Sequence, residues 1–414
     1  GKSVTAMLRA PAASALLLVT MGIAAWKLNQ GPSPVLLVPT LSGQAEYCLT
    51  CHGDLPVISR SHPLAQFGCV SCHGGERLAL TADLAHSTLR GGANPSDLAV
   101  AEASCGGDAC HSGAAADQRD QIARLLPNLH ATYAGAIAIM RYQAGAQPDL
   151  LPRQAITIEV QGEAAASGVR ALATFDPAHE QASSLQAFAK NCLFCHLSAP
   201  PLPGAATARF SGCAACHSQP ADGDLKQTVH RLNTDIAYDR CNACHQRGMY
   251  DVQAVQFQPR RDQPTKRQEA YYLPGTAAAK CEFRLDCVDC HTRHEIMGDG
   301  NLYGSQREAR YVECRTCHGD LAAPPLTRTI DQPDDLALRL AAANLAVRLE
   351  VGDTIVVTAR GEPLWNMRRL ADGRFELVAK ATGQHHIVPL VQGSGCQQNA
   401  AQQEAKYCHV CHAS

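Results

Sequence analysis

Aromatic residues are scarce in this chain of 414 residues, which has 8 Phe, 10 Tyr and 2 Trp, or 5% of the sequence. Hydrophobic residues make up 46%, and many of them are alanine. The bulky side chains that usually fill the core of a chain this long are therefore largely missing. We expect something other than side chains to fill much of the interior.

The chain also lacks an excess of charge of either sign. It has 36 Lys and Arg against 38 Asp and Glu, a formal net charge of −2, and no run of basic residues stands out. Proteins that bind nucleic acid carry basic patches that follow the phosphates. We expect no nucleic-acid partner.

A long uncharged run stands at the N-terminus. Residues 10–26 carry no charge and are rich in Leu, Val, Ile and Ala, with Lys2 and Arg9 before them and Lys27 after. With Arg9 extended to the membrane surface, the span reaches back to residue 4, which is long enough to cross a bilayer. We predict an uncleaved transmembrane anchor within residues 1–30. The alternative is a secretory signal peptide cleaved near Ala25.

The basic residues before this span place the N-terminus in the cytoplasm and the rest of the chain outside it. The sequence thus predicts a single-pass protein of the cytoplasmic (inner) membrane. Its body would lie in the periplasm, which is an oxidising compartment.

Cysteine is as abundant as the aromatic residues, with 20 in the chain. Eight segments read Cys-x-x-Cys-His, and a ninth has a longer gap, Cys105-Gly-Gly-Asp-Ala-Cys110-His111. The paired cysteines are Cys48 and Cys51, Cys69 and Cys72, Cys105 and Cys110, Cys192 and Cys195, Cys213 and Cys216, Cys241 and Cys244, Cys287 and Cys290, Cys314 and Cys317, and Cys408 and Cys411. The histidines that follow them are His52, His73, His111, His196, His217, His245, His291, His318 and His412.

Positions i, i+3 and i+4 lie on one face of a helical turn. Two thiols can therefore bond to the vinyl groups of one haem while the histidine reaches its iron, which is c-type haem attachment. A single Cys-x-x-Cys could equally be a redox dithiol or half of a zinc site, or, at Cys105, a glycine-rich loop closed by a disulfide. Nine copies, each followed directly by His, favour nine haem c groups.

On these segments the chain resembles the multihaem c-type cytochromes, from Cys48 to His412. The resemblance implies a mainly α and irregular fold wrapped on covalently bound haems, with small β insertions and one N-terminal transmembrane helix. The nine histidines above would be the proximal iron ligands.

Nine further histidines remain, because 18 − 9 = 9. They are candidates for the distal iron ligands: His62, His86, His130, His179, His230, His294, His385, His386 and His409. His385 and His386 should point to opposite faces of an extended segment, so we expect one of them to bind iron. His294 and His409 are too close to their own attachment segments and would bind neighbouring haems. One iron could instead carry Met140, Met249, Met297 or Met367, a lysine or an open face, although packing is the ordinary role of these methionines.

Two cysteines are left over, Cys281 and Cys396. Outside the cytoplasm, an even remainder favours one disulfide between them, and the alternative is two unpaired thiols.

The spacing of these segments predicts six parts of the chain. They are the anchor (1–30), a three-haem cluster (31–116), a helix with a β insertion (117–185), a five-haem cluster (186–325), a second helix with a β insertion (326–400) and a C-terminal haem site (401–414). In the first insertion we expect a helix over 117–142 broken near Pro127, then strands near 156–161 and 169–175. In the second we expect a helix capped by Asp334, then strands near 346–360, 375–379 and 386–391.

An iron held by two histidines has no open position, so such haems carry electrons and do little bond chemistry. The sequence therefore predicts an electron carrier and not an enzyme. It would transfer electrons between a membrane redox partner and a periplasmic redox protein, as a subunit of a larger respiratory or photosynthetic complex. The single anchor is similar to that of the anchored tetrahaem quinol dehydrogenases, but the haem number and the β segments differ.

Two other functions stay open. One is an oxidoreductase of the nitrite, hydroxylamine or tetrathionate type, in which one haem keeps an open face and Cys105–Cys110 is the atypical attachment site. The other is a subunit of a polymeric haem wire, which a retained membrane helix disfavours.

Overall fold

The computed structural model describes residues 19–22, 33–92, 94–156, 160–161, 163–164, 169, 171–193, 197, 211–221, 224–236, 240–241, 249–251, 256–258, 285–344, 346–399 and 408. The chain divides into two compact units, residues 1–93 and 94–414. No helix within the described ranges is long and apolar enough to cross a membrane. Of the expected anchor, residues 19–22 are described and are helical, and the others lie outside the described residues.

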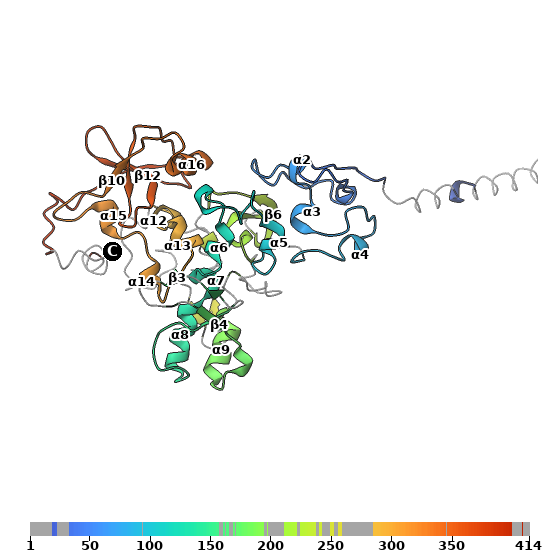
Figure 1. The fold of residues 1–414 in the computed structure, drawn as a ribbon, viewed down its shortest axis with the longest axis horizontal. Helices are drawn as coiled ribbons and strands as arrows, with labels where there is room; N and C mark the ends of the chain where they lie inside the picture. Colours follow the sequence, from blue (N-terminus) through green and yellow to red (C-terminus); the bar gives the residue numbers. More distant parts are fainter. Residues whose placement is uncertain are drawn as a thin grey trace, which may run out of the picture. The chain divides into compact units, whose positions relative to one another are not determined.

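Over residues 33–92, the first unit is built from single helical turns joined by loops (Figure 1). Its short backbone bridges pair Leu37 with Glu46, Ser59 with His62, and Gly74 with Leu89. The turns are η1 (Cys48–Thr50), α2 (Leu64–Phe67), α3 (Val70–His73) and α4 (Ala82–Ala85).

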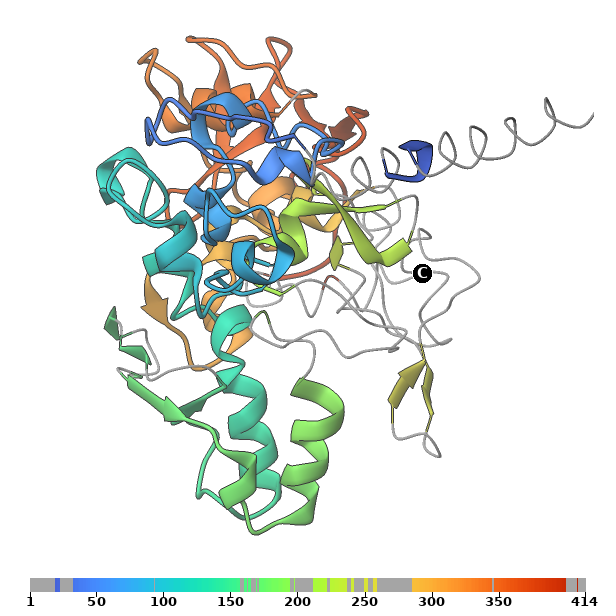
Figure 2. The same ribbon diagram turned by 90° about the vertical axis from the view of Figure 1, so that its right-hand side faces the viewer.

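The second unit begins with short helices that lead into a helical pair. The helices are α5 (Ala101–Cys105), η2 (Ala115–Asp117), α6 (Gln121–Leu125), α7 (Leu129–Thr132), α8 (Ala134–Gln143), η3 (Pro177–His179) and α9 (Ser183–Cys192). Helices α8 and α9 lie side by side in both views (Figures 1 and 2) around a core of Ile137, Phe175, Phe188 and Leu193. The helix expected over 117–142 is present as α6, α7 and α8, and its break near Pro127 is confirmed; Gln118, at φ 58°, and Tyr133, at φ 55°, add two further breaks.

The expected strands of the first insertion are present as short pieces. They are β1 (Gln154–Ala155), β2 (Val160–Gln161), β3 (Glu163–Ala164) and β4 (Ala171–Thr174). Strand β4 lies between β1 and β2, and β3 pairs in parallel with β9 (Asn301–Leu302). Further along the chain, α10 (Ala214–His217) precedes two hairpins, β5 (Ser218–Ala221) with β6 (Asp224–Leu232) and β7 (Met249–Asp251) with β8 (Gln256–Gln258).

The C-terminal part is an antiparallel sheet with helical segments against both faces. Its strands are β10 (Thr327–Thr329), β11 (Thr354–Val357), β12 (Pro363–Arg369), β13 (Phe375–Val378) and β14 (His385–Val388), in that spatial order. The helical segments are α12 (Cys287–Cys290), α13 (Arg293–Met297), α14 (Gln306–Ala309), α15 (Cys314–His318) and α16 (Leu336–Ala343). One face packs against α16 through Ile355 and Trp365, and the other packs against Leu285, Val312 and Cys317.

Three details of the second insertion differ from the expectation. Asp335 caps α16, and Asp334 does not, because the Asp335 carboxylate accepts the Ala337 amide at 2.8 Å. The strand expected near 346–360 is confined to β11, because the Asn344 side chain and the turn at Gly352 shape the residues before it. Strands β10 and β12 were not expected.

Candidate functional site: the attachment turns

The Cys-x-x-Cys-His segments that the structure describes in full share one helical turn. In four of them the histidine amide donates to the carbonyl of the first cysteine, four residues earlier. The N···O distances are 3.1 Å for His52, 2.9 Å for His73, 3.0 Å for His217 and 2.8 Å for His291. A fifth segment, Cys314–His318, is helix α15. This bond defines one helical turn, so both cysteines and the histidine lie on one face, as attachment to a single haem requires.

The longer segment, Cys105–His111, makes the same hydrogen bond from its histidine to its first cysteine, although its backbone differs. Cys105 is the last residue of α5, and the His111 amide donates to its carbonyl at 3.1 Å. The extra residues form a loop in which Gly107 has φ 108°, a conformation that favours glycine. Cys105 and Cys110 form no disulfide. The insertion therefore still brings His111 back to the first cysteine.

The other segments are described in part. Cys192 ends α9, and Cys241 and Cys408 are in helical conformation. Outside the described residues lie Cys195, His196, Cys244, His245, Cys281, His409, Cys411 and His412. The expected disulfide between Cys281 and Cys396 is thus not tested.

Two of the motif histidines have a fixed tautomer. Nδ1 of His217 lies 2.8 Å from the carbonyl oxygen of Asn233, and Nδ1 of His318 lies 2.7 Å from that of Pro389. A carbonyl oxygen can only accept, so Nδ1 carries the proton and the lone pair is on Nε2. Burial lowers the pKa of His217, which keeps its ring neutral. Metal-binding histidines are held by this kind of second hydrogen bond.

His291 is held by a carboxylate. Its Nδ1 lies 2.9 Å from Oε2 of Glu295, and the other carboxylate oxygen, Oε1, accepts the amides of Tyr311 and Val312. Burial alone would raise the pKa of Glu295, but these hydrogen bonds outweigh it and lower the pKa, so the group is ionised near neutral pH. The role of Glu295 was not predicted from the sequence, although the capping box of Thr292 and Glu295 marks it as a helix-start residue close to His291.

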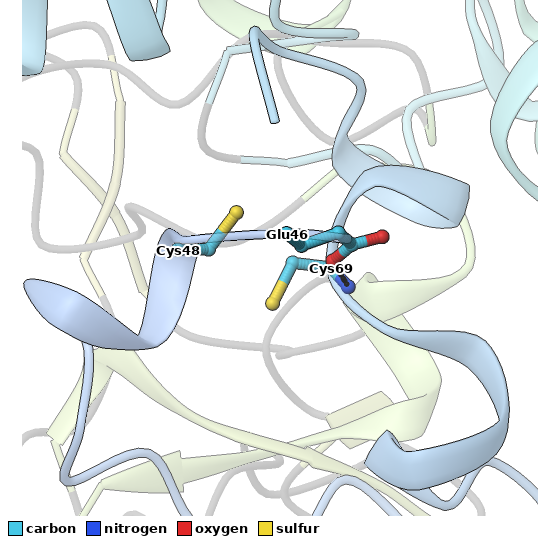
Figure 3. Close-up of side chains that lie close together, drawn as sticks. All are labelled: Glu46, Cys48 and Cys69. Atoms are coloured by element: carbon cyan, nitrogen blue, oxygen red, sulfur yellow. Dashed lines mark hydrogen bonds between the residues drawn. The ribbon is translucent and has the colours of Figure 1, made fainter. Parts of the chain in front are cut away.

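In the first unit, the first cysteines of two attachment turns meet (Figure 3). The side-chain ligand atoms of Glu46, Cys48 and Cys69 all lie within 4.8 Å of one another. A hydrogen bond with Cys69 lowers the pKa of the Cys48 thiol to about 7, and the same bond raises the pKa of Cys69. Three such ligands could also hold a metal ion. However, the Glu46 carboxylate, on a residue only 2% exposed, accepts the backbone amide of Cys69 at 2.7 Å.

The same unit brings two histidines together. The ring centres of His52, in the first attachment turn, and His86, at the end of α4, are 6.1 Å apart with 42° between the planes. Both side chains are exposed. Among the spare histidines, His86 therefore lies beside a histidine of a Cys-x-x-Cys-His segment, His52.

First cysteines also approach one another in the second unit. The Cys241 and Cys287 thiols are hydrogen-bonded, which lowers the pKa of Cys287 and raises that of Cys241. Burial, with a contribution from Cys105, raises the pKa of Cys213 to about 12. The Cys213 amide donates to the carbonyl of Ser96 at 3.1 Å. Ser96 lies just before α5, so this bond brings the turn of Cys213 close to that of Cys105.

Other distal candidates are also oriented through Nδ1. His62 contacts the Ser59 hydroxyl at 3.0 Å, His130 the Asn128 side chain at 3.2 Å, and His179 the Asp176 carboxylate at 2.7 Å. The His130 carbonyl accepts the Leu197 amide at 3.4 Å, which places it beside the fourth attachment segment. The His179 side chain is 87% exposed. His230 lies half-buried in β6.

The prediction that His385 and His386 face opposite sides of a strand is confirmed. His385 is exposed and contacts Glu376 at 2.8 Å. His386 lies opposite Leu377, on the face that packs against Cys317, and its Nε2 is buried without a hydrogen-bond partner. His386 is therefore the better iron-ligand candidate of the two.

His294 is in a different environment. Its Nε2 lies 3.1 Å from Arg293 and 3.4 Å from Arg124, while Nδ1 lies 3.4 Å from Glu362. Two guanidinium groups at Nε2 do not favour binding of iron there. Of the methionines, Met367 is fully buried in the sheet core and Met140 packs beside Ile137, which supports the packing interpretation for both.

Comparisons with protein-family models, curated proteins and solved structures find no match for this chain.

Proposed function

We propose that the chain is a nonahaem c-type cytochrome that transfers electrons. The observation that carries this proposal is the recurrence of one helical turn at the Cys-x-x-Cys-His segments, together with motif histidines whose lone pair is fixed on Nε2. In each turn the two cysteines would hold the porphyrin and the histidine would hold the iron. The bound haem supplies a one-electron couple.

The hydrogen bonds at Nδ1 of the motif histidines support a role in tuning the iron. Asn233 and Pro389 orient His217 and His318 through carbonyl oxygens, whereas Glu295 orients His291 through a full negative charge. A stronger acceptor makes the imidazole more basic and favours ferric iron. These haems would thus differ in potential although their first ligands are the same.

Electron transfer is favoured over catalysis by the supply of second ligands. His62, His130 and His179 are held at Nδ1, and His386 has its Nε2 buried. Two imidazoles on one iron leave no position for a substrate. As proposed partners we keep the membrane, through the N-terminal segment, and membrane and periplasmic redox proteins within a larger respiratory or photosynthetic complex.

One cluster favours the second function, an oxidoreductase. Arg124 is 7% exposed and lies with Arg293 around His294, next to the attachment turn of His291. Nε of Arg293 and one terminal nitrogen of Arg124 are buried without a hydrogen-bond partner in the structure. Burial, reinforced by the charge of Arg124, lowers the pKa of Arg293 to about 10. A small oxyanion beside an open haem would suit such a cluster.

Low-temperature electron paramagnetic resonance of the air-oxidised protein tests the proposal, with haem content fixed by a pyridine haemochrome assay. Nine low-spin haems support the electron carrier. A high-spin signal from about one haem places the enzyme first. If the protein is purified from a host that attaches haem c and contains no haem, both the electron carrier and the haem enzyme are refuted. The alternative metal site would then be tested by measuring bound metal and the alkylation of Cys48 and Cys69.

A further inference from the structure

The first unit contains two complete attachment turns, those of His52 and His73, and a loop, residues 74–90, that contains His86. The inference below rests on the proposed function, because it concerns how this unit would hold two haems. Three observations carry it: the contact between Cys48 and Cys69, the buried carboxylate beside them, and the distance between His52 and His86.

Glu46 fixes the two turns against each other. It stands two residues before Cys48, and its backbone exchanges hydrogen bonds with Leu37 at 2.9 and 2.7 Å. Its carboxylate reaches 23 residues along the chain to the amides of Cys69 and Val70, at 2.7 and 3.4 Å. Gly68 has φ 65°, and a Cβ there would lie 2.7 Å from the carboxylate. The juxtaposition of Cys48 and Cys69 is therefore built into the fold of this unit.

A thioether lies at the edge of its porphyrin. Sulfur atoms as close as those of Cys48 and Cys69 would therefore bring two porphyrin edges into contact. Electron transfer between such haems needs no intervening side chain.

His86 is positioned by the second turn but faces the first. The Arg90 amide donates to the His73 carbonyl at 2.8 Å, and the Arg90 guanidinium donates to the Ser71 carbonyl at 2.9 Å. The Glu76 amide donates to the Ala85 carbonyl at 3.0 Å, next to His86. This loop is thus hydrogen-bonded to the turn of His73, while its histidine, His86, lies next to His52.

The distance between the two ring centres is close to the value expected for two imidazoles that share one iron. An imidazole nitrogen binds a metal ion at about 2.0–2.1 Å and lies about 1.1 Å from its ring centre, so two imidazoles on opposite sides of one ion would have centres about 6.2–6.4 Å apart. The centres of His52 and His86 are 6.1 Å apart. The 42° between the planes is compatible, because each ring can rotate about its iron–nitrogen bond.

We propose that residues 33–92 hold the first two haems as a contact pair, in which Glu46 keeps Cys48 against Cys69 and His86 is the second ligand of the iron bound by His52. His86 would then join the haems twice, through its loop to one and through its ring to the other.

The ligand assignment is tested with His86→Met in the full-length holoprotein. Methionine raises the potential relative to histidine, so one haem in nine should show a higher midpoint and an altered low-spin signal. Leu84→Met is the control, because it adds the same side chain on the same helix. If nine haems are bound and His86→Met retains the wild-type signals and potentials, the assignment is wrong while the proposed function stands. Absence of haem from the wild type would overturn both.

The contact pair is tested by circular dichroism in the Soret band, where two touching porphyrins give a band split into opposite signs. Glu46→Ala removes the acceptor for the Cys69 and Val70 amides and should reduce this splitting. Glu46→Gln keeps an acceptor oxygen and should retain it. Equal splitting in wild type and Glu46→Ala, with nine haems in each by haemochrome, would refute the pair.

Discussion

The first unit and the C-terminal sheet bury side chains in opposite ways. In residues 33–92 the buried residues are Pro39, Glu46 and Gly68, whereas large apolar side chains such as Leu36 and Val57 are 60% and 69% exposed. In the sheet, Ile355, Val356 and Met367 are fully buried. A segment of this length without an apolar core is not stable by side-chain packing alone. We therefore expect the first unit to depend on the proposed haems for its fold, whereas the sheet is stabilised by side-chain packing.

The largest effect should come from preventing haem attachment. Expressed in a host that cannot attach haem c, the chain should lose the fold of residues 33–92 and keep that of residues 327–388. Limited proteolysis with mass spectrometry would show early cleavage in the first range and late cleavage in the second. Equal protection of both ranges in the haem-free chain would contradict this comparison.

A cavity in the sheet should be the next largest effect. Met367→Ala removes a fully buried side chain and should cost about 2–5 kcal/mol of unfolding free energy. Haem content should stay the same, because the core around Phe375 and Leu377 is formed by side chains. Guanidinium unfolding followed by far-UV circular dichroism measures the cost. Ala342→Gly, at an exposed position of α16, is a control with an expected cost of about 1 kcal/mol.

The carboxylate at His291 should affect the iron more than the fold. Glu295→Gln removes the negative charge next to Nδ1 and should raise the potential of that haem by about 60 mV. For a one-electron couple, this equals a tenfold change in the preference of the site for ferric over ferrous iron. Because the folded pKa of Glu295 is lowered, its stabilising effect is present above pH 4.5 and is lost as the pH falls through the folded pKa. Spectroelectrochemistry of the wild type and Glu295→Gln at neutral pH tests the shift in potential, and identical sets of potentials would rule out the role of Glu295.

The smallest effect should come from the cap of α16. Asp335→Ala removes the acceptor for Ala337 and the partner of Arg328, and should cost about 1 kcal/mol. The hydrogen bond from Arg328 lowers the pKa of Asp335, so the cost should be complete above pH 3.8 and should disappear as the pH falls through the folded pKa. Unfolding curves of both proteins at neutral and acidic pH check this. Asp334→Ala should change little; a larger loss there would mean that Asp334 is the cap.

The sequence allowed prediction of whatever is local. The attachment turns follow from spacing alone, because both cysteines and the histidine lie within one helical turn. The opposite orientation of His385 and His386 follows from the period of a strand. In contrast, Glu46 contacts Cys69 across 23 residues, and Asn233 holds His217 across 16, and no local pattern predicts either contact. Strand β12 escaped prediction because it is buried on both faces, so its residues do not alternate between apolar and polar.

The approach of Cys105 to Cys213 also has a consequence for the order of assembly during synthesis. Asn94 and Ser211, whose side chains are hydrogen-bonded near these cysteines, are 117 residues apart, whereas the turns of the first unit are neighbours along the chain. A contact of such long range cannot form until the ribosome has supplied both partners, and it carries a greater loop-closure cost. The first unit could thus mature while the chain is still growing. The third attachment site, at Cys105, could bind its haem early but could not contact the fifth, at Cys213, until that part of the chain has been made.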